Sequence, residues 1–573
     1  MISKILKFFN LNSTKLDITK SIILFFLSIL NALFQIFFIS TFYIIIEYLL
    51  GNEPSINSKL INFTLNYFKN GKDLILLCLV ILFLSLLIQL IYSFLSNKWI
   101  TLFVQKLEIN IFNQTLNKKV VFFKKVQSYN YIKKIIDNVP RLSMGVFFPV
   151  LNIIASYFII TLYIIFLLNI NYKITLITLL LICSISFFIF YFIKKKLIKI
   201  STNENYFLKE RIKFINDTIT YFRDIKIYNL NKLFLKKFLN VSKGYFESRY
   251  RSYFYSSFPK TIFEFLIFSI LLFVLLILFF NKGNSFENHI PTASIYLLVI
   301  YKLVPCFMSL LSSYANISAN IKFFDIVEKE YNNLNKDLEP TINYSQNKNL
   351  KINTINLQNI SFNYEEKNIV NNINITLKKG ESLILTGETG AGKSTILDII
   401  SGLIYQNNGK IILNNNIEVE KNNFNELRSK ISYVSQNSDI FEESIYDNVT
   451  LNFDEKINSE KILKDNKFQN ILNLCLIDKL LKNKNISPFD TLLEKGRDLS
   501  GGEKQRIIIG RALYKNCDIL ILDEATSALN TDIEKKILKN IIDFCTDKIF
   551  ILCTHNIHLK NMFSKHIEIK KTN

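Results

Sequence analysis

Cysteine is scarce in this chain, and none stands at a spacing that builds a site. The 573 residues include seven cysteines, and no pair of them forms a CxxC motif or another metal-ligand spacing. We therefore expect reduced thiols, several of them buried as small apolar groups. We expect neither a disulfide framework nor a metal site built by cysteine.

The chain also lacks the signature of a nucleic-acid-binding protein. Its net charge is +22, which is one reason to consider nucleic acid. No basic run is interleaved with stacking aromatic residues, however, so we expect no nucleic-acid partner. The excess of Asn, Ile, Lys and Phe favours genomic base bias as one explanation of the positive charge. Many basic residues also lie between apolar spans, where membrane topology requires them.

A cleavable signal peptide is the third missing feature. A basic stretch precedes the first apolar span, but that span is too long and has no small-residue cleavage site. We interpret it as a retained helix.

Long apolar spans dominate the first part of the chain. Half of all residues are hydrophobic, and the apolar ones are concentrated before about residue 320. Six spans have roughly the length that a helix needs to cross a bilayer, about 20 residues: 20–46, 73–96, 147–168, 174–193, 261–280 and 293–313. We expect a six-helix transmembrane domain at 1–328, a polar linker at 329–350 and a soluble α/β domain at 351–573.

The basic residues predict an orientation. Segments 97–146 and 194–260 are rich in Lys and Arg, whereas the turns near 169–173 and 281–292 carry one Lys each. Positive charge marks the cytoplasmic side. We therefore expect a multi-pass protein of the cell inner (cytoplasmic) membrane, with the soluble domain in the cytoplasm.

The two basic segments have few helix breakers and a recurrent apolar spacing. They predict helices that extend about 30 Å beyond the membrane, since about 20 residues rise that far. Each would form a hairpin that touches the soluble domain, with tips near Gln127–Tyr131 and Asn216–Asp224. A plain helical insertion is the alternative. Residues 56–71 are either a short helix on the outer leaflet or an external loop.

A phosphate loop opens the chemistry of the soluble domain. Residues Gly387–Thr395 read GETGAGKST, between an apolar strand and a helix. Its glycines permit a tight loop whose N–H groups surround phosphate, Lys393 adds charge at the β- and γ-phosphates, and Ser394 is a Mg²⁺ ligand. The predicted ATP-binding residues of the loop are Gly387, Glu388, Thr389, Gly390, Ala391, Gly392, Lys393, Ser394 and Thr395.

Two acids follow a second apolar strand, ILILDE, Ile519–Glu524. Asp523 can hold Mg²⁺ through water, and Glu524 can polarise an attacking water. Paired acids at a strand end are common as mere solvation, but their place downstream of a phosphate loop favours the catalytic interpretation.

With LSGGEKQR at Leu499–Arg506, the region of about 350–570 resembles the nucleotide-binding domain of the ATP-binding cassette (ABC) family. The resemblance implies that ATP is sandwiched between two such domains. It also implies residue roles: Tyr364 in SFNY stacks on adenine, Gln436 in YVSQ reaches the metal and the transmembrane hairpins, and His555 in CTHN contacts the γ-phosphate. The signature, Ser500, Gly501, Gly502 and Glu503, would bind the γ-phosphate of the partner's ATP.

Two positions depart from the family's pattern. Glu503 stands where the family often has Gln, which should leave the phosphate contacts of the signature intact. Asn530 stands where Asp is usual, which bears on cross-talk between the two ATP sites. The catalytic Glu524 is retained, so ATP hydrolysis with Mg²⁺ is expected at both sites.

Six spans ahead of one ATPase domain resemble an exporter-type ABC half-transporter. The resemblance implies a partner, because the signature serves the other chain's ATP and six helices enclose half a pathway. We expect a homodimer in the bilayer, with a heterodimer as the alternative.

The cargo is suggested by polar residues inside the spans, since intramembrane charge is costly. Lys302 lies within the sixth span, Lys260 and Glu264 open the fifth, and Gln89 lies in the second. Lys260 and Glu264 could instead snorkel at the interface. We assign Lys302, Lys260 and Gln89 to a substrate cavity suited to an anionic amphiphile.

The motifs FPKTIFE, INYKITL and IYKLVP also resemble the flippases of lipid-linked oligosaccharides in bacterial protein N-glycosylation. This resemblance implies a polyprenyl-pyrophosphate-linked glycan moved from the cytoplasmic to the outer leaflet. Gln89 departs from it, because those flippases have a basic residue there.

Other functions stay open. One is export of peptides or drug-like amphiphiles, which the lack of a peptidase-like extension before the first span disfavours. Another is a non-transporting membrane ATPase or gate, which the intact Glu524 opposes. A soluble DNA-associated ATPase does not fit six spans.

Overall fold

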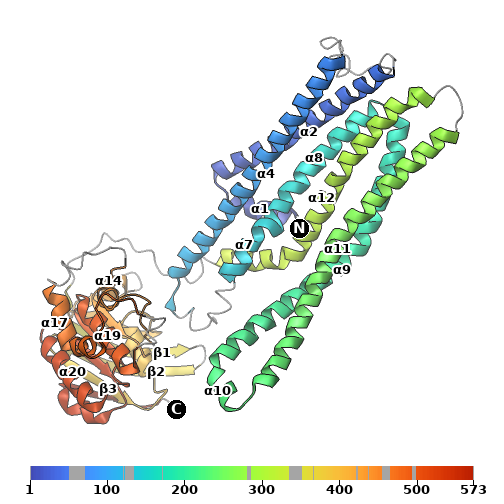
Figure 1. Cartoon of the computed structure of the whole chain (residues 1–573). Coiled ribbons are helices and arrows are strands. Elements are labelled where there is room, and N and C mark those ends of the chain that lie inside the picture. The colour runs from blue at the N-terminus through green and yellow to red at the C-terminus, as the bar shows by residue number, and fades with distance from the viewer. Residues whose placement is uncertain are drawn as a thin grey trace. The chain divides into compact units, whose positions relative to one another are not determined.

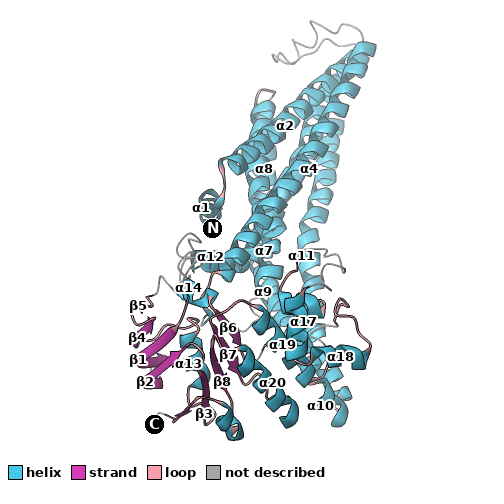
Figure 2. Ribbon diagram, turned by 90° about the vertical axis from the view of Figure 1, so that its left-hand side faces the viewer, coloured by secondary structure: helices cyan, strands magenta, loops and turns pink. Residues whose placement is uncertain are grey.

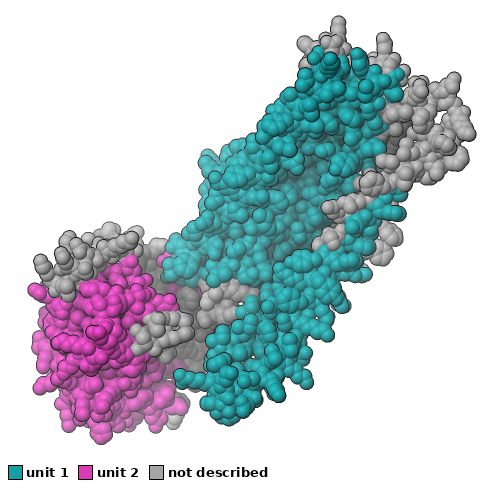
Figure 3. Space-filling model, in the orientation of Figure 1, with its two compact units in different colours: residues 1–116, 126–336 teal, residues 117–125, 337–573 magenta. Residues whose placement is uncertain are grey.

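The structure is a computed structural model whose chain divides into two compact units (Figure 3). One unit holds residues 1–116 and 126–336, and the other holds 117–125 and 337–573. The structure describes residues 2–50, 71–120, 122, 134–170, 172–280, 286–333, 351–364, 367–420, 424–436, 438–453, 465–492 and 499–571; within 173–201 and 256–293, many side chains are not described.

The first unit is built of long helices (Figure 1). The long ones are α2 (Lys15–Leu49), α4 (Gly71–Leu116), α8 (Phe148–Leu168), α9 (Tyr172–Thr220), α11 (Asn231–Phe280) and α12 (Phe286–Asn333). The short ones are α1 (Ile2–Asn12), η1 (Lys134–Asn138), α7 (Val139–Leu142), η2 (Ser143–Phe147) and α10 (Phe222–Ile227). Each predicted span falls within one long helix, the third one beginning in η2.

Length and hydropathy identify membrane-crossing helices in this unit. Among the described residues, four segments are long and apolar enough to cross a bilayer: 15–49, 71–116, 135–168 and 294–332. Many side chains in the apolar parts of α9 and α11 lie outside the description. The helical, apolar transmembrane domain predicted from the sequence is thereby confirmed.

The helices pack in pairs, α2 with α4, α8 with α12, and α9 with α11. One apolar core joins α2, α8 and α12 around Tyr43, Tyr163 and Val299. A second joins α1 to α4 and α12, with Phe8, Phe103 and Phe324 buried together. Lys4 ties α1 further to α12, because its ammonium lies 2.6 Å from Asp325 and 2.5 Å from Glu328.

The predicted hairpins are partly within the description. α9 ends at Thr220 and α10 begins at Phe222, so the end of α9 lies inside the predicted tip at Asn216–Asp224. The other predicted tip, Gln127–Tyr131, lies outside the described residues, as do 56–70. Residues 117–125 nevertheless group with the second unit, in which the Lys119 ammonium lies 5.6 Å from the Tyr405 ring.

The second unit contains two sheets (Figure 2). The antiparallel sheet has the order β2-β1-β4-β5, and the other, with all its pairs parallel, has the order β6-β7-β8-β3-β9. The strands are β1 (Thr354–Tyr364), β2 (Lys367–Lys378), β3 (Ser382–Gly387), β4 (Asn408–Leu413), β5 (Ile417–Glu418), β6 (Ile431–Val434), β7 (Ile519–Asp523), β8 (Ile549–Cys553) and β9 (Lys565–Ile569).

Helices cover the parallel sheet on both faces. They are α13 (Lys393–Ile400), α14 (Phe424–Ser429), α15 (Ile445–Thr450), α17 (Asn466–Leu474), α18 (Ile477–Lys484), α19 (Gly501–Tyr514), α20 (Thr531–Phe544) and η4 (Ile557–Met562). Figure 2 shows α13 between the two sheets and α19 and α20 on the opposite side of the parallel sheet.

The two faces follow from the alternation of side chains along a strand. In β7, Ile519 and Ile521 pack into the core shared with α13 and the antiparallel sheet. Leu520 and Leu522 pack into the core shared with α19 and α20. A sheet buried on both faces requires strands with continuous apolar runs, and β7 supplies four buried apolar residues before the buried Asp523 at its end.

Candidate active site

Four predicted site segments meet because their strands are parallel neighbours. The phosphate loop follows β3, and Gln436 and His555 follow β6 and β8. Asp523 is the last residue of β7, and Glu524 comes directly after it. The order β6-β7-β8-β3 is continuous and parallel. The carboxyl ends of such strands lie at one edge, which is where ligands of open α/β sheets bind.

The phosphate loop depends on glycine at two positions. Gly387 has φ 147° and Gly392 has φ 93°. A Cβ at Gly387 would lie 2.3 Å from the carbonyl oxygen of Ile569, and one at Gly392 would lie 2.7 Å from that of Ile369. At Gly390 nothing lies within 4 Å of such a Cβ, so the surface of the loop is open at that point.

Lys393 fills the loop from inside. The residue is only 5% exposed, and its ammonium donates to the carbonyl oxygens of Gly387 at 2.7 Å and Glu388 at 3.0 Å. Its charge is thus held at the concave side of the loop and at the N-terminus of α13, where backbone N–H groups also favour an anion. The other predicted loop residues are placed around it: Glu388, Thr389, Gly390 and Ser394 are exposed, Thr395 is half-buried and Ala391 is buried.

Asp523 is a buried carboxylate with an incomplete set of partners. It is 2% exposed, and its Oδ1 has no hydrogen-bond partner. Burial raises the pKa of this carboxyl, and a side-chain hydrogen bond with Ser394 opposes that rise in pKa. A buried oxygen left unpaired beside a serine hydroxyl is the donor chemistry that Mg²⁺ prefers, so the residues present fit the metal.

The three predicted catalytic residues converge. Gln436 donates its Nε2–H to Glu524 Oε2 at 2.6 Å, and His555 Nε2 lies 2.9 Å from Glu524 Oε1. Glu524 has φ 50°, a conformation that is uncommon for a residue other than glycine, and its N–H donates to the carbonyl oxygen of Cys553 at 2.9 Å. The carboxylate is therefore held at the strand end, with one oxygen hydrogen-bonded to Gln436 and the other in close contact with His555.

The signature begins helix α19. Ser500 is its N-cap, and Glu503 completes a capping box, since its carboxylate accepts the Ser500 N–H at 2.7 Å. Lys484 pairs with the same carboxylate at 2.9 Å. Gly502 is required by close packing, because a Cβ there would lie 2.8 Å from the carbonyl oxygen of Ala528.

Among the described residues, the signature and the phosphate loop share no direct polar contact. Across the described residues, no hydrogen bond or ion pair joins Ser500, Gly501, Gly502 or Glu503 to residues 387–395. The arrangement leaves the N-terminus of α19 available to a ligand held elsewhere. Asn530, the other departure from the family's pattern, is the N-cap of α20 and accepts the Asp532 N–H at 3.3 Å.

Four predicted residues are not brought into a common site. Tyr364 is the last residue of β1, opposite Lys367, and its side chain lies outside the description. Lys302 is half-buried on α12, and Gln89 is exposed on α4. The side chain of Lys260 on α11 is not described. No contact between Lys302 and Gln89 is found in the part of the chain that the structure describes.

Sequence reasoning missed several polar residues that support the site. Tyr433 on β6 donates its hydroxyl to Asp398 at 3.2 Å and to Asp523 at 3.4 Å. Gln505 on α19 donates to Ser527 and accepts from the Ala528 N–H. The only sequence signal for either residue was its place within YVSQ or LSGGEKQR, which alone does not distinguish a polar contact from solvation.

Two buried glutamates were missed as well. Glu534, 5% exposed, accepts from Thr526 at 2.6 Å and Asn556 at 3.2 Å, linking the segments after β7 and β8. Glu47 on α2 is 3% exposed and accepts from the Tyr43 hydroxyl at 2.5 Å. A carboxylate just past the predicted end of a span is a signal that could have identified Glu47.

Comparison with known proteins decides the family. The family model described as "ABC transporter transmembrane region" matches residues 21–302, and the one described as "ABC transporter" matches 370–527. The chain belongs to the ABC transporter family. An ABC transmembrane region fused to an ABC ATPase domain is the half-transporter arrangement of exporters, and the ATPase domain binds ATP.

Several curated proteins are similar to this ABC transporter. The "ATP-dependent lipid A-core flippase" of Francisella tularensis subsp. holarctica (strain OSU18) is 32% identical over 197 residues, 34% of this chain and 31% of that protein. The protein of the same name from Haemophilus influenzae (strain 86-028NP) is 33% identical over 206 residues, 35% of this chain and 34% of that protein. The "Lactococcin-A transport/processing ATP-binding protein LcnC" of Lactococcus lactis subsp. lactis is 33% identical over 216 residues, 38% of this chain and 29% of that protein. The chain thus spans about a third of the length of these curated relatives.

One solved structure matches almost the whole ABC half-transporter. It is that of a bacterial Atm1-family ABC exporter with ATP bound, with a TM-score of 0.75 and 16% sequence identity, covering 97% of this chain and 94% of that chain. At this identity the likeness shows the fold.

Proposed function

We propose that this chain is one half of an ATP-driven exporter or flippase. Two copies would hydrolyse ATP and move an anionic amphiphile from the cytoplasmic to the outer leaflet. The observation that supports the proposal most strongly is the joining, in one chain, of an apolar six-helix region to an ATPase site. In that site Glu524 accepts a hydrogen bond from Gln436 and lies 2.9 Å from His555 Nε2.

The ATPase residues divide the work. Lys393 and the N–H groups of the loop bind the phosphates. Ser394 and Asp523, with Gln436, would hold Mg²⁺, which supplies charge neutralisation at the β- and γ-phosphates. Glu524 accepts the proton of the attacking water, and Gln436 and His555 orient its carboxylate. The adenine would stack on Tyr364.

A second copy would complete each site. Ser500, Gly501, Gly502 and Glu503 lie apart from their own phosphate loop in the hydrogen-bond network, so we assign them to the ATP of the partner. The same arrangement would arise in a heterodimer, and co-purification of a second chain would identify it.

The proposed location is the cell inner membrane. Lys and Arg concentrate in 97–146 and 194–260, and this bias supports a cytoplasmic side for both segments and the ATPase domain. Hydrolysis there would use cytoplasmic ATP.

The proposed cargo is a lipid-linked oligosaccharide or a similar anionic lipid. Lys302 is a half-buried cation on an apolar helix, and two copies facing one pathway would attract a phosphate or pyrophosphate. Lys260 and Gln89 are proposed to line the same path. The names of the Francisella and Haemophilus relatives, lipid A-core flippases, support a lipid as cargo.

Export of a peptide or a drug-like amphiphile is the second candidate. It is favoured by the similarity to a protein named for lactococcin-A transport and processing. A non-transporting gate is disfavoured, because a gate has no need of the hydrogen-bonded Glu524.

Transport in proteoliposomes tests the proposal. The purified chain is reconstituted with Mg²⁺ and ATP, and three fluorescent cargoes are compared: a lipid-linked oligosaccharide, a lipid A precursor and an amphiphilic peptide. We expect ATP-dependent translocation of an anionic lipid, abolished in Glu524→Gln. Translocation of the peptide alone would replace the lipid with the second candidate, and failure with every cargo despite ATP turnover would contradict transport of these classes.

The role of Lys302 needs a matched control in the same helix. Lys302→Ala should abolish lipid translocation while basal ATP hydrolysis persists. Lys322→Ala, at an exposed position of α12, should preserve both activities. Equal transport by the two variants would exclude Lys302 from the cargo path.

A further inference from the structure

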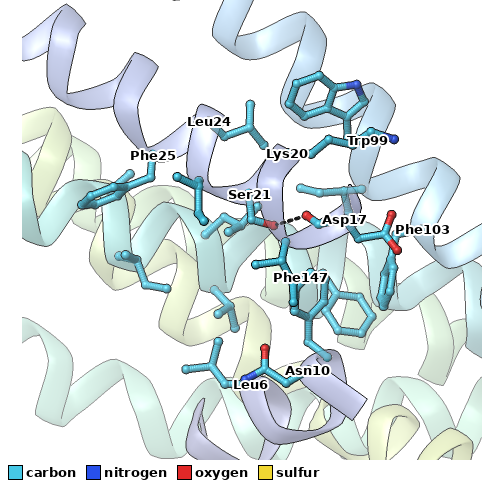
Figure 4. Close-up of a pocket in the computed structure, with 18 of the residues that line it drawn as sticks. Leu6, Asn10, Asp17, Lys20, Ser21, Leu24, Phe25, Trp99, Phe103 and Phe147 are labelled. Carbon is cyan, nitrogen blue, oxygen red and sulfur yellow. Dashed lines mark hydrogen bonds between the residues drawn. The ribbon is translucent and has the colours of Figure 1, made fainter. Parts of the chain in front are cut away.

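An apolar pocket lies between α1 and the long helices of the first unit (Figure 4). Its cavity volume is about 280 Å³. Helices α1, α2, α4 and α8, together with η2, supply its walls, and the larger lining side chains include Phe9, Phe25, Phe103 and Phe147. Neither Lys302 nor Gln89 is among the lining residues.

The polar groups of the pocket gather at the beginning of α2. Asp17, Lys20 and Ser21 line it there, and Trp99 of α4 lies beside Lys20 in Figure 4. The Lys20 ammonium lies 5.9 Å from the centre of the Trp99 ring. The pocket is therefore apolar over most of its wall and polar along one rim.

Among the described residues that line this rim, one cation has no acidic partner. Asp17 is neutralised by Lys106, whose ammonium lies 3.3 Å from its carboxylate, and it also accepts from Thr14. Ser21 donates to the Asp17 backbone carbonyl at 3.0 Å. Lys20, by contrast, has no acidic partner among the residues that the structure describes. The rim is thus suited to one negative charge.

The rim lies where two apolar spans of the sequence end. The apolar part of α2 begins at Lys20, and that of α4 ends shortly before Trp99. Lysine on α2 and tryptophan on α4 are typical of the headgroup level, and the lining residues Phe25 of α2 and Val150, Leu151 and Ile154 of α8 belong to the apolar spans on the hydrocarbon side of it. Lys20 at the rim would therefore face a lipid headgroup, and the apolar lining of α2 and α8 would face the acyl chain of the same lipid.

We propose that this pocket binds one acyl chain of an anionic phospholipid, with the lipid phosphate at Lys20. The volume is near the low end of small-molecule sites, which begin at about 300 Å³, and so suits a stretch of one acyl chain rather than a whole amphiphile. The lipid is a resident of the leaflet on the side of the ATPase domain. That leaflet assignment rests on the proposed topology, whereas the binding itself does not depend on transport.

The bound lipid would hold α1 in place. α1 contributes Ile5, Leu6, Phe9 and Asn10 to the pocket. The same helix is tied to α12 through Lys4, which pairs with Asp325 and Glu328. An acyl chain in the pocket therefore fills the space between α1 and the membrane helices and supports that attachment.

Trp99 makes the proposal directly measurable, because the chain has one tryptophan. The full chain is reconstituted without ATP in vesicles that contain brominated phosphatidylglycerol or brominated phosphatidylcholine, both of which quench nearby tryptophan. We expect the anionic lipid to quench Trp99 at about a fivefold lower mole fraction, since one basic residue near an anionic membrane contributes about 1 kcal/mol.

Three variants separate this site from general lipid contact. Lys20→Gln should abolish the difference between the two lipids. Lys98→Gln, which removes an equal charge from an exposed residue whose ammonium faces Phe94 instead, should keep it. Ala155→Phe adds a ring to a buried lining position and should lower quenching by both lipids.

The contrary outcomes are equally defined. Equal quenching by the two lipids in the unaltered chain, equal effects of Lys20→Gln and Lys98→Gln, or unchanged quenching in Ala155→Phe would each overturn the proposal. Displacement of the brominated lipid by a lipid-linked oligosaccharide would instead make the pocket an entry site for cargo. None of these readings changes if the transport assay fails, because no ATP is used.

Discussion

Glu524 carries the proposed hydrolytic chemistry at the scale of single residues. Its two carboxylate oxygens are engaged by Gln436 at 2.6 Å and by His555 at 2.9 Å. Each partner comes from the end of a different strand, so the carboxylate is oriented by groups far apart in the sequence. General-base catalysis by a positioned group of this kind contributes about 10²- to 10⁴-fold in rate.

The first prediction concerns that carboxylate. Glu524→Gln should lower the ATP hydrolysis rate by about 10²- to 10⁴-fold while ATP binding is retained, because the amide cannot accept the proton of water. Steady-state phosphate release and equilibrium binding of a fluorescent ATP analogue measure the two quantities. An unchanged hydrolysis rate would remove Glu524 from the catalytic role.

The second prediction concerns Asp523 and pH. Burial raises the pKa of its carboxyl, and only the ionised form can hold Mg²⁺. A proton therefore competes with the metal at a higher pH than the usual Asp value of about 3.9 would suggest. The Mg²⁺ concentration needed for half-maximal ATPase activity should rise as the pH falls towards that raised pKa.

Substitution separates this effect from general acid damage. Asp523→Asn should weaken Mg²⁺ binding and remove its dependence on the Asp523 proton. Asp532→Asn, at an exposed position of α20, should keep the behaviour of the unaltered chain. If the Mg²⁺ requirement were flat across pH in the unaltered chain, the burial argument for Asp523 would be wrong.

The sequence indicated part of this residue pattern. Lys393, Ser394 and the two acids at the end of β7 stand in sequence motifs that indicate their chemistry. Gln436 and His555 were predicted from the family resemblance. The roles of Tyr433 and Gln505 could not be predicted, because their partners lie far along the chain. The partners of Tyr433 are 35 and 90 residues away, and those of Gln505 are 22 and 23 residues away. A single polar residue in a buried strand or an amphipathic helix gives no periodic signal for such contacts.

Helix α19 shows how an element can accommodate a departure in sequence. Glu503, where the family often has Gln, closes the capping box with Ser500 and pairs with Lys484. The ion pair offsets an added negative charge next to the signature. Glu503, the residue that departs from the family's pattern, therefore helps to cap the N-terminus of α19, where the signature begins.

The third prediction follows from this cap. Glu503→Ala should lower the free energy of unfolding of the chain by about 1 kcal/mol, the usual contribution of a helix cap. Glu503→Gln keeps an acceptor for the Ser500 N–H and should lose less. Thermal unfolding of both variants measures the difference, and equal stability of Glu503→Ala and the unaltered chain would show that the cap adds nothing.

The pH dependence of the cap has a definite sign. Burial acts to raise the pKa of Glu503, but hydrogen bonds with Ser500 and Lys484 outweigh it and lower that pKa overall. A lowered pKa means that the contribution to stability is complete above the unfolded value and is lost as pH falls through the folded one. The stability difference between Glu503→Gln and the unaltered chain should therefore shrink in acid.

Elements were more predictable than contacts. The apolar spans gave the long helices of the first unit because a run of apolar residues that long has few other solutions. Helix α1 was not predicted as an element, since its eleven residues lie outside the apolar run. Its burial depends on Phe8 and Ile5 meeting α4 and α12, contacts of high sequence separation that a pattern cannot show.

At the scale of the whole molecule, the chain has one ABC transmembrane region and one ABC ATPase domain, so a full transporter would need a second pair of such domains. The phosphate loop, Asp523 and Glu524 lie at one sheet edge, whereas the signature begins α19 with no hydrogen bond or ion pair to that loop among the described residues. The closed symmetry usual for such assemblies is two-fold, in which each chain gives the other the same surface. Two ATP molecules would then each be bound by the loop of one chain and the signature of the other.

Retention of ATP by mixed dimers tests whether each ATP site is shared between two chains. All chains carry Glu524→Gln to prevent hydrolysis; one also carries Lys393→Ala, which disables the loop, and the other Ser500→Arg, which blocks the signature. Neither variant alone should retain ATP. A mixture should retain it at about a quarter of its sites, because random pairing makes half of the dimers mixed and one site in each mixed dimer is intact. Absence of ATP retention in the mixture, or full retention by the Ser500→Arg chain alone, would contradict a site shared between two chains.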